Sequence, residues 1–151
     1  RSDDPVERAD ACHRLAMDTD VPQNVVKALR DCLDDESVQV RQLAIEALGQ
    51  VDPDLDGLVI HLQRAIDDPD ATVRVAAAIT SLRIDPQLPA AREPVLAAIR
   101  ERHPQLIRAL GELGPSVSWA APAVRELVTD PEPQIRELAK LTLSRIQDDA
   151  P

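Results

Sequence analysis

A motif in this chain recurs at a fixed interval, and a repeat of this kind constrains the fold more than any other feature of the sequence. The stretch from Asp35 to Arg41 returns as Asp68 to Arg74, and this step defines the period of the repeat. A third copy, Asp130 to Arg136, begins slightly less than two periods after the second, so one of the intervening periods is shortened. Because a unit of this size cannot bury an apolar face alone, we expect the copies to stack on one another.

Apolar residues keep the same register and indicate that each copy is a pair of helices. In the first half of the first full unit, Val25, Leu29 and Leu33 recur at intervals of four, which places them on one stripe of a helix. In the second half a small Ala44 stands between Val40 and Leu48, so neighbouring helices can approach closely. We predict helices over residues 4–16, 22–33, 37–50, 55–66, 70–83, 91–101, 104–113, 119–128 and 132–147.

This pattern predicts a single repeat domain over residues 1–151. It consists of a half-unit at 3–17 and full units at 22–51, 55–84, 88–114 and 118–147. Composition agrees, because a chain with one Trp and neither Tyr nor Phe lacks the aromatic residues that favour a β-sheet core. We therefore predict an all-α fold, a right-handed α–α superhelix of about four and a half helix pairs.

The repeated residues resemble the pattern of HEAT repeats, in which Asp is followed by Val-Arg or Ile-Arg, then by Ala and Leu. In the first full unit these residues are Asp35, Val40, Arg41, Ala44 and Leu48. The tracts Leu33–Val51 and Asp130–Leu143 especially resemble the short HEAT-like units of phycobilisome lyases. The resemblance covers nearly the whole chain and implies an armadillo-like α solenoid, but such repeats serve as scaffolds in many unrelated settings.

The most conspicuous polar residues are aspartates in the turns between paired helices, each followed six positions later by an arginine. A carboxylate in such a turn can favour the N-terminal end of the second helix. The resemblance implies that each arginine bridges to the turn aspartate of the neighbouring unit, so we interpret the set as a structural ladder and not as a substrate-binding row. The ladder residues are Asp35, Arg41, Asp68, Arg74, Asp130 and Arg136. The third full unit departs from the pattern, with Glu101 and Ile107 at these positions.

Second helices usually line the concave face of such a solenoid, so we expect partner-binding residues one, five and eight positions after each ladder arginine. The second full unit places Val75, Ile79 and Leu82 there, which predicts an apolar docking patch unless this helix is more deeply buried. The last unit has Glu137, Leu141 and Ser144 at the same positions. The candidate partner-binding residues are Gln42, Glu46, Val75, Ile79, Leu82, Arg108 and Glu112.

The residues that usually carry chemistry do not form known constellations, and we predict no catalytic residue, no cofactor and no metal. His13, His61 and His103 are scattered, and no serine stands in a G-x-S-x-G motif. Cys12 and Cys32 lack C-x-x-C spacing; a bridge between them is possible, but buried unpaired cysteine is the commoner arrangement. We expect Trp119, the one aromatic residue, to pack over the turn after Gly114 and not to act as a hot spot.

Charge excludes further classes of partner. The chain has 17 basic and 27 acidic residues, a net charge of −10, and no basic stripe that could neutralise several phosphates, so we expect no nucleic-acid partner. No apolar run approaches the roughly 20 residues that span a bilayer, so we expect no membrane insertion. We expect a cytoplasmic protein that is part of a longer chain or complex.

Together these features predict a non-catalytic scaffold that presents a concave, acidic and partly apolar groove to a protein or peptide. The alternative, which rests on family likeness alone, is a subunit of a bilin lyase-like enzyme that acts as a heterodimer.

Overall fold

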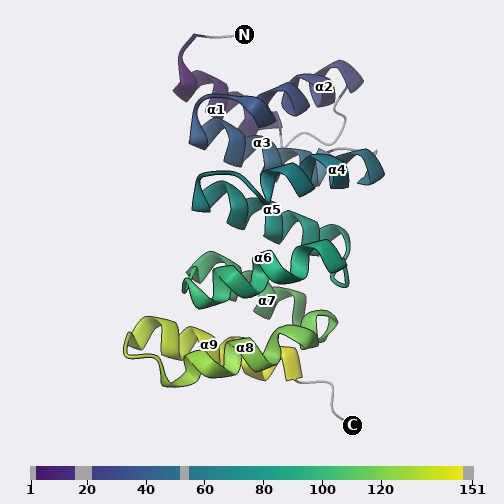
Figure 1. Cartoon of the computed structure of the whole chain (residues 1–151). Helices are drawn as coiled ribbons and strands as arrows, with labels where there is room; N and C mark the ends of the chain where they lie inside the picture. Colours follow the sequence, from purple (N-terminus) through teal and green to yellow (C-terminus); the bar gives the residue numbers. More distant parts are fainter. Residues whose placement is uncertain (1–2, 16–21, 52–54, 148–151) are drawn as a thin grey trace. The chain divides into compact units, whose positions relative to one another are not determined.

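The computed structural model describes residues 3–15, 22–51 and 55–147 (Figure 1). The chain divides into two compact units, Arg1–Ile84 and Asp85–Pro151. The division falls between the predicted repeats 55–84 and 88–114, so the single domain predicted over residues 1–151 contains two compact parts. Every element in the described part of the chain is helical, which confirms the all-α prediction and is consistent with an α–α solenoid.

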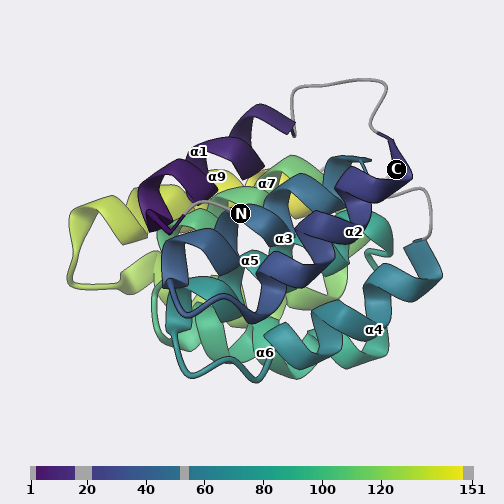
Figure 2. The same cartoon turned by 90° about the horizontal axis from the view of Figure 1, so that it is seen from above.

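Unit 1 (Arg1–Ile84) consists of alternating first and second helices of the repeat. Its elements are α1 (Pro5–Leu15), α2 (Gln23–Asp31), the 3₁₀ turn η1 (Cys32–Asp34), α3 (Val38–Val51), α4 (Leu55–Ala65) and α5 (Ala71–Ile84). The second helices stack, with α3 in contact with both α1 and α5 (Figure 1). The first helices α2 and α4 lie on the same side of α3 in the turned view (Figure 2).

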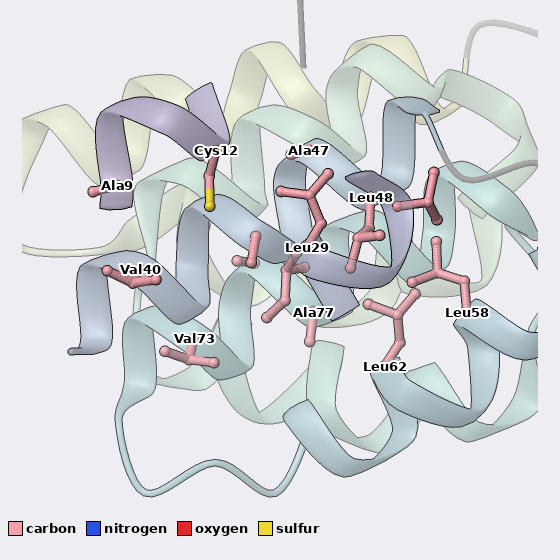
Figure 3. Close-up of a cluster of buried hydrophobic side chains, with 14 of the residues drawn as sticks. Ala9, Cys12, Leu29, Val40, Ala47, Leu48, Leu58, Leu62, Val73 and Ala77 are labelled. Atoms are coloured by element: carbon pink, nitrogen blue, oxygen red, sulfur yellow. The ribbon is translucent and has the colours of Figure 1, made fainter. Parts of the chain in front are cut away.

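The core of unit 1 lies between these two rows of helices (Figure 3). Leu29 of α2, Leu48 of α3 and Leu62 of α4 are no more than 1% exposed. Each such leucine stabilises the fold by about 1.5 to 3 kcal/mol relative to an exposed side chain. Small residues separate the leucines at the helix contacts, where Ala44 and Ala77 are fully buried. The predicted helix-pair register therefore accounts for this core.

Unit 2 (Asp85–Pro151) contains two more helix pairs, joined by irregular turns. Its elements are α6 (Pro89–Arg100), α7 (Pro104–Leu113), the 3₁₀ segment η2 (Gly114–Ala120), α8 (Ala121–Glu126), the 3₁₀ turn η3 (Leu127–Thr129) and α9 (Pro133–Gln147). The second helices α7 and α9 pack along each other, and α9 also packs on α8. This repeats the arrangement seen in unit 1.

The helix predicted over residues 119–128 is only partly α-helical. The structure has η2 and η3 on either side of a short α8. Gly114 takes a left-handed φ of 59°, Pro115 follows it, and Val117 departs from helical geometry with φ −113° and ψ 27°. These departures break the backbone repeat that an α-helix needs, so the α-helix begins only at Ala121.

The side chain of Trp119 links the irregular segment η2 to other residues of unit 2. Its indole Nε1–H donates to the carbonyl oxygen of Pro86 at 3.0 Å, and the guanidinium of Arg92 lies 5.4 Å from the ring centroid. The side-chain amide of Gln87 donates to the carbonyl oxygen of Ser116 at 2.5 Å. Trp119 thus packs against the segment that precedes α6 and against Arg92 of α6; that it also packs over the turn after Gly114 stays a prediction.

Candidate functional site

The turn aspartates shape the entry to each second helix. Asp35 Oδ1 accepts the backbone N–H of Ser37 at 2.9 Å, and Asp68 Oδ1 accepts that of Asp70 at 2.8 Å. Asp130 makes the same bond to Glu132 at 2.9 Å. In each case the helix begins one residue later, so this bond closes a turn immediately before the helix.

The same carboxylates also receive an arginine from the preceding unit. Arg41 Nε and Nη2 donate to Asp68 Oδ2 and Oδ1 at 2.8 and 3.0 Å, a two-bond fork that joins α3 to the turn before α5. Both side chains are largely buried, 13% and 11% exposed. Such a planar pair is among the stronger hydrogen-bonded arrangements in proteins. The structure therefore brings these two ladder residues together across neighbouring units.

Each ladder arginine also holds its own turn. Arg41 Nη1 donates to the carbonyl oxygen of Asp35 at 2.8 Å. Arg74 and Arg136 make the matching bonds to the carbonyl oxygens of Asp68 and Asp130, at 2.9 and 2.7 Å. The Arg41 guanidinium thus spans two repeats, with its own turn on one side and the next turn's carboxylate on the other. That Arg74 and Arg136 bridge to a following unit as Arg41 does stays a prediction.

Two further arginines belong to this ladder, and the sequence analysis missed both. Arg8 Nε and Nη2 donate to Asp35 Oδ2 and Oδ1 at 2.9 and 2.8 Å, and the two side chains are buried. The signal was present, because Arg8 precedes Arg41 by the same step that separates Asp35 from Asp68. The periodicity therefore identifies Arg8 as a ladder residue in the half-unit.

The second missed residue, Arg102, occupies a different place in the repeat. It lies in the turn before α7, and its Nε donates to Asp130 Oδ2 at 2.6 Å. Its φ is 61°, and the N–H groups of Arg102 and His103 donate to the carbonyl oxygens of Ile99 and Ala98, which closes the end of α6 as a Schellman motif. Arg102 supplies the lateral ion pair that Ile107, buried in α7, cannot make.

These contacts change the acidity of two ladder carboxyls. Burial alone would raise the pKa of Asp68, but the hydrogen bonds from Arg41 and from the Asp70 backbone outweigh burial and hold the pKa below its usual value. For Asp130 the Glu132 N–H lowers the pKa most; burial opposes this effect, and Arg102 adds to it. Both carboxyls are therefore ionised at neutral pH and serve as anionic anchors of the turns.

The predicted apolar docking patch on α5 is wrong as an exposed surface. Val75 is 6% exposed and Leu82 is fully buried, while Ile79 is partly buried. The helix is buried nearly all round because apolar or small residues occupy most of its positions, from Val73 through Ala78. The alternative of deeper burial is thus the correct one, and Glu substitution at Leu82 would place a charge in the interior.

The other predicted partner-binding residues have accessible side chains. On α3, Gln42 and Glu46 are partly exposed, and Gln42 Nε2 donates to Glu46 Oε1 at 3.0 Å. On α7, Arg108 and Glu112 are exposed. Burial therefore separates the seven candidates into accessible residues on α3 and α7 and largely buried residues on α5.

An exposed apolar residue lies on α9 instead. Leu141 is 50% exposed and follows Glu112 by the same step that relates Leu106 of α7 to Ile135 of α9. The helices α7 and α9 pack as consecutive second helices, and the contacts of Thr142 with Ile107 and Gly111 place Leu141 next to this stretch of α7. We name this surface the α7–α9 face. It consists of Arg108, Glu112, Glu137 and Leu141, all exposed.

The backbone beneath the α7–α9 face is closely packed. Thr142 Oγ1 donates to the carbonyl oxygen of Ile107 at 3.0 Å. A Cβ atom built on Gly111 would lie 3.1 Å from that hydroxyl oxygen and 3.6 Å from Cδ of Arg145. The glycine lets the two helices approach, and the hydroxyl joins them at the level of Arg108 and Leu141. The exposed side chains therefore stand on a fixed support.

Neither a metal site nor a membrane span can be assigned in this part of the chain. Within residues 3–15, 22–51 and 55–147, no three His, Cys, Asp or Glu side chains gather in a way that could hold a metal ion. No helix among these residues is both long and apolar enough to cross a membrane.

Comparison with known proteins identifies the repeat. No match to a curated protein was found. A family model described as HEAT repeats matches residues 1–83 and, in a second overlapping alignment, residues 26–111. The match covers well over half of the chain and includes both the Arg8–Asp35 and the Arg41–Asp68 pairs. The chain belongs to the HEAT-repeat family.

Proposed function

We propose that this chain is a non-catalytic interaction scaffold that holds a protein or peptide partner along the exposed sides of its second helices. HEAT repeats generally act as protein-interaction scaffolds. The observation that carries the proposal here is the α7–α9 face, where a half-exposed Leu141 stands among charged side chains on closely packed helices. A rigid face of this kind binds without first having to order its own backbone.

The chemistry of the face suggests the kind of partner. Arg108 supplies positive charge, Glu112 supplies negative charge, Glu137 is paired with Lys140 at 2.8 Å, and Leu141 supplies an apolar contact. A peptide helix with one apolar side chain between charged groups of both signs complements this arrangement. On α3, Glu46 adds acidic character, and we propose that it extends the partner-binding surface of unit 1 together with Gln42.

The overall charge favours a protein over a polyanion. With a net charge of −10, the chain repels phosphate backbones, and Arg8, Arg41 and Arg102 are already engaged by carboxylates. We therefore propose a protein or peptide and not a nucleic acid as the partner, in keeping with a member of a larger complex.

The test compares two exposed apolar residues, one on a second helix and the other on a first helix. Leu141 lies on the second helix α9, and Ile60, 58% exposed, lies on the first helix α4. A partner is captured with the wild-type chain from a lysate of the source cells, identified, purified and titrated calorimetrically against Leu141→Glu and Ile60→Glu. We expect Leu141→Glu to weaken binding at least about tenfold and Ile60→Glu to leave it unchanged, with equal melting temperatures for both.

Two outcomes would contradict the proposal. Equal binding by both variants would show that the α7–α9 face is not the binding surface. A bilin that co-purifies with the chain, or bilin transfer in the presence of a second subunit, would favour the lyase-like alternative instead.

A further inference from the structure

Two cysteines of unit 1 meet between α1 and the turn that follows α2. Cys12 is 2% exposed and belongs to the core, where its sulfur points from α1 into the cluster (Figure 3). Cys32, the first residue of η1, is partly exposed and packs against the same cluster. Cys32 lies close enough to raise the pKa of the Cys12 thiol, and both cysteines are free thiols in the structure.

An ion pair holds the two segments together close to the thiols. Arg8 lies one helical turn before Cys12 on α1, and its guanidinium forks onto Asp35 at 2.9 and 2.8 Å. Asp35 in turn is tied to η1, because its N–H donates to the carbonyl oxygen of Cys32 at 3.2 Å. The pair therefore fixes the distance between the backbones that carry the two sulfurs.

We propose that Cys12 and Cys32 are a redox-sensitive pair that a low-molecular-weight disulfide, such as oxidised glutathione, converts into a disulfide joining α1 to η1. The bridge adds a covalent link beside the Arg8–Asp35 pair. Because it closes a loop that contains all of α2, the bridge removes conformational freedom from the unfolded chain and stabilises the attachment of the first helix.

The exposure of the two sulfurs sets the order of the reaction. The Cys32 thiolate attacks one sulfur of the glutathione disulfide, a mixed disulfide forms on Cys32, and one glutathione thiolate leaves. Cys12 then loses its proton to solvent and attacks the Cys32 sulfur, which expels the second glutathione thiolate. The two cysteine thiols are oxidised by two electrons in total, and the external disulfide is reduced to two thiols.

The second step is slow at neutral pH. Burial above all, followed by the neighbouring Cys32 and Asp35, raises the pKa of Cys12 to about 12. Because the thiolate is the attacking species, the rate of bridge closure rises about tenfold for each unit by which the pH increases, as long as the pH stays below that pKa. Because the Asp35 carboxylate is already paired with Arg8, it repels the Cys12 thiolate less strongly than an unpaired carboxylate would.

The test exposes the reduced full chain to excess oxidised glutathione without denaturant, between pH 7 and 9. We expect intact-mass spectrometry to show the mixed disulfide first and then a product lighter than the reduced chain by two hydrogens, with closure faster at higher pH. Both thiols are then unreactive, and the melting temperature rises by about 5 to 10 °C.

Two variants show which cysteine takes part in each step of the oxidation. Cys32→Ala should acquire neither the adduct nor the bridge while folded, and Cys12→Ala should stop at the mixed disulfide without the rise in melting temperature. Two wild-type results, independent of either variant's folding, would overturn the proposal: a reaction that ends at the mixed disulfide, or a bridged chain whose melting temperature is unchanged or lower.

Discussion

The hydroxyl of Thr142 in α9 donates to the backbone carbonyl of Ile107 in α7, at 3.0 Å. Ile107 occupies the position where the repeat otherwise has a ladder arginine, and both residues are at most 1% exposed. Where the arginine is missing, the second helices are thus joined through a buried hydroxyl at their closest approach, while Arg102 makes the ion pair from the turn.

We predict that Thr142→Val lowers the free energy of unfolding by about 1 kcal/mol, because it removes one buried hydrogen bond but keeps the side chain's branched shape. The Ile107 carbonyl lies within α7 and keeps its helical partner, which limits the loss. Urea denaturation of the two proteins measures the difference. An unchanged midpoint would mean that the hydroxyl contributes nothing to the packing of α7 on α9.

A close approach of the same kind occurs in unit 1 between Gly49 of α3 and Thr80 of α5. A Cβ atom on Gly49 would lie 2.5 Å from Cγ2 of Thr80, well inside van der Waals contact. In a helix, Ala is more favourable than Gly by about 1 kcal/mol. We nevertheless predict that Gly49→Ala lowers the free energy of unfolding by a net value of about 1 to 2 kcal/mol, because α3 and α5 must move apart to accommodate the new methyl group.

The partner residue provides the control for this prediction. Thr80→Ser removes the methyl group that the new Cβ would meet, so Gly49→Ala should cost much less in a Thr80→Ser background. A double-mutant cycle measured by thermal unfolding gives the coupling between the two positions. Additive effects would show that some other contact opposes a side chain at residue 49.

The period of the repeat was sufficient to predict most of the helices and the ladder, because both depend on residue types that recur in register. It would also have identified Arg8, which follows the same period. Arg102 could not be found in this way, since it acts from a left-handed turn position that no other copy uses among the residues described. Its contact to Asp130 depends on the path of the backbone and not on the spacing of residues.

Helical spacing also could not decide which side of α5 is covered. Val75, Ile79 and Leu82 have the spacing of an exposed stripe in a solenoid, but whether a stripe is exposed depends on all the elements that pack on the helix. The polar residues at the matching positions of α9, Glu137 and Ser144, are exposed. The apolar Leu141, at the middle one of these positions, is 50% exposed as well, so neither position in the repeat nor residue character alone predicts which side of a second helix is covered.

The Arg41–Asp68 pair should be a measurable part of the stability of unit 1. Arg41→Ala leaves the Asp68 carboxylate without its fork, and we predict a loss of about 1 to 3 kcal/mol. Asp68→Ala should cost a similar amount, and the double variant should cost less than the sum, because neither charge is then left unpaired. Additivity in this cycle, measured by denaturant unfolding, would mean that the two residues act separately.

Acid should weaken the same contact. The pKa of Asp68 is lower in the folded chain than the value of about 3.9 in an unfolded chain, so the unfolded state binds the proton more readily. The stabilisation is therefore complete above about pH 5 and is lost as the pH falls through the folded pKa. We predict that wild type is more stable than Asp68→Asn at pH 7 and that this gap narrows steadily toward pH 2. A gap independent of pH would show that the carboxylate charge is not what stabilises the turn.

Substitutions at Arg102 can distinguish the effect of backbone conformation on stability from the effect of charge. Its φ of 61° is unfavourable for any residue with a Cβ, and glycine adopts it without that cost. Both Arg102→Gly and Arg102→Ala remove the ion pair to Asp130, so the difference between them reports the backbone alone. We predict that Arg102→Gly is the more stable of the two by about 1 kcal/mol, measured by urea denaturation. Equal stability of Arg102→Ala and Arg102→Gly would contradict this prediction. It would mean that residue 102 leaves the left-handed conformation when the guanidinium is removed, so that the ion pair to Asp130 causes that conformation.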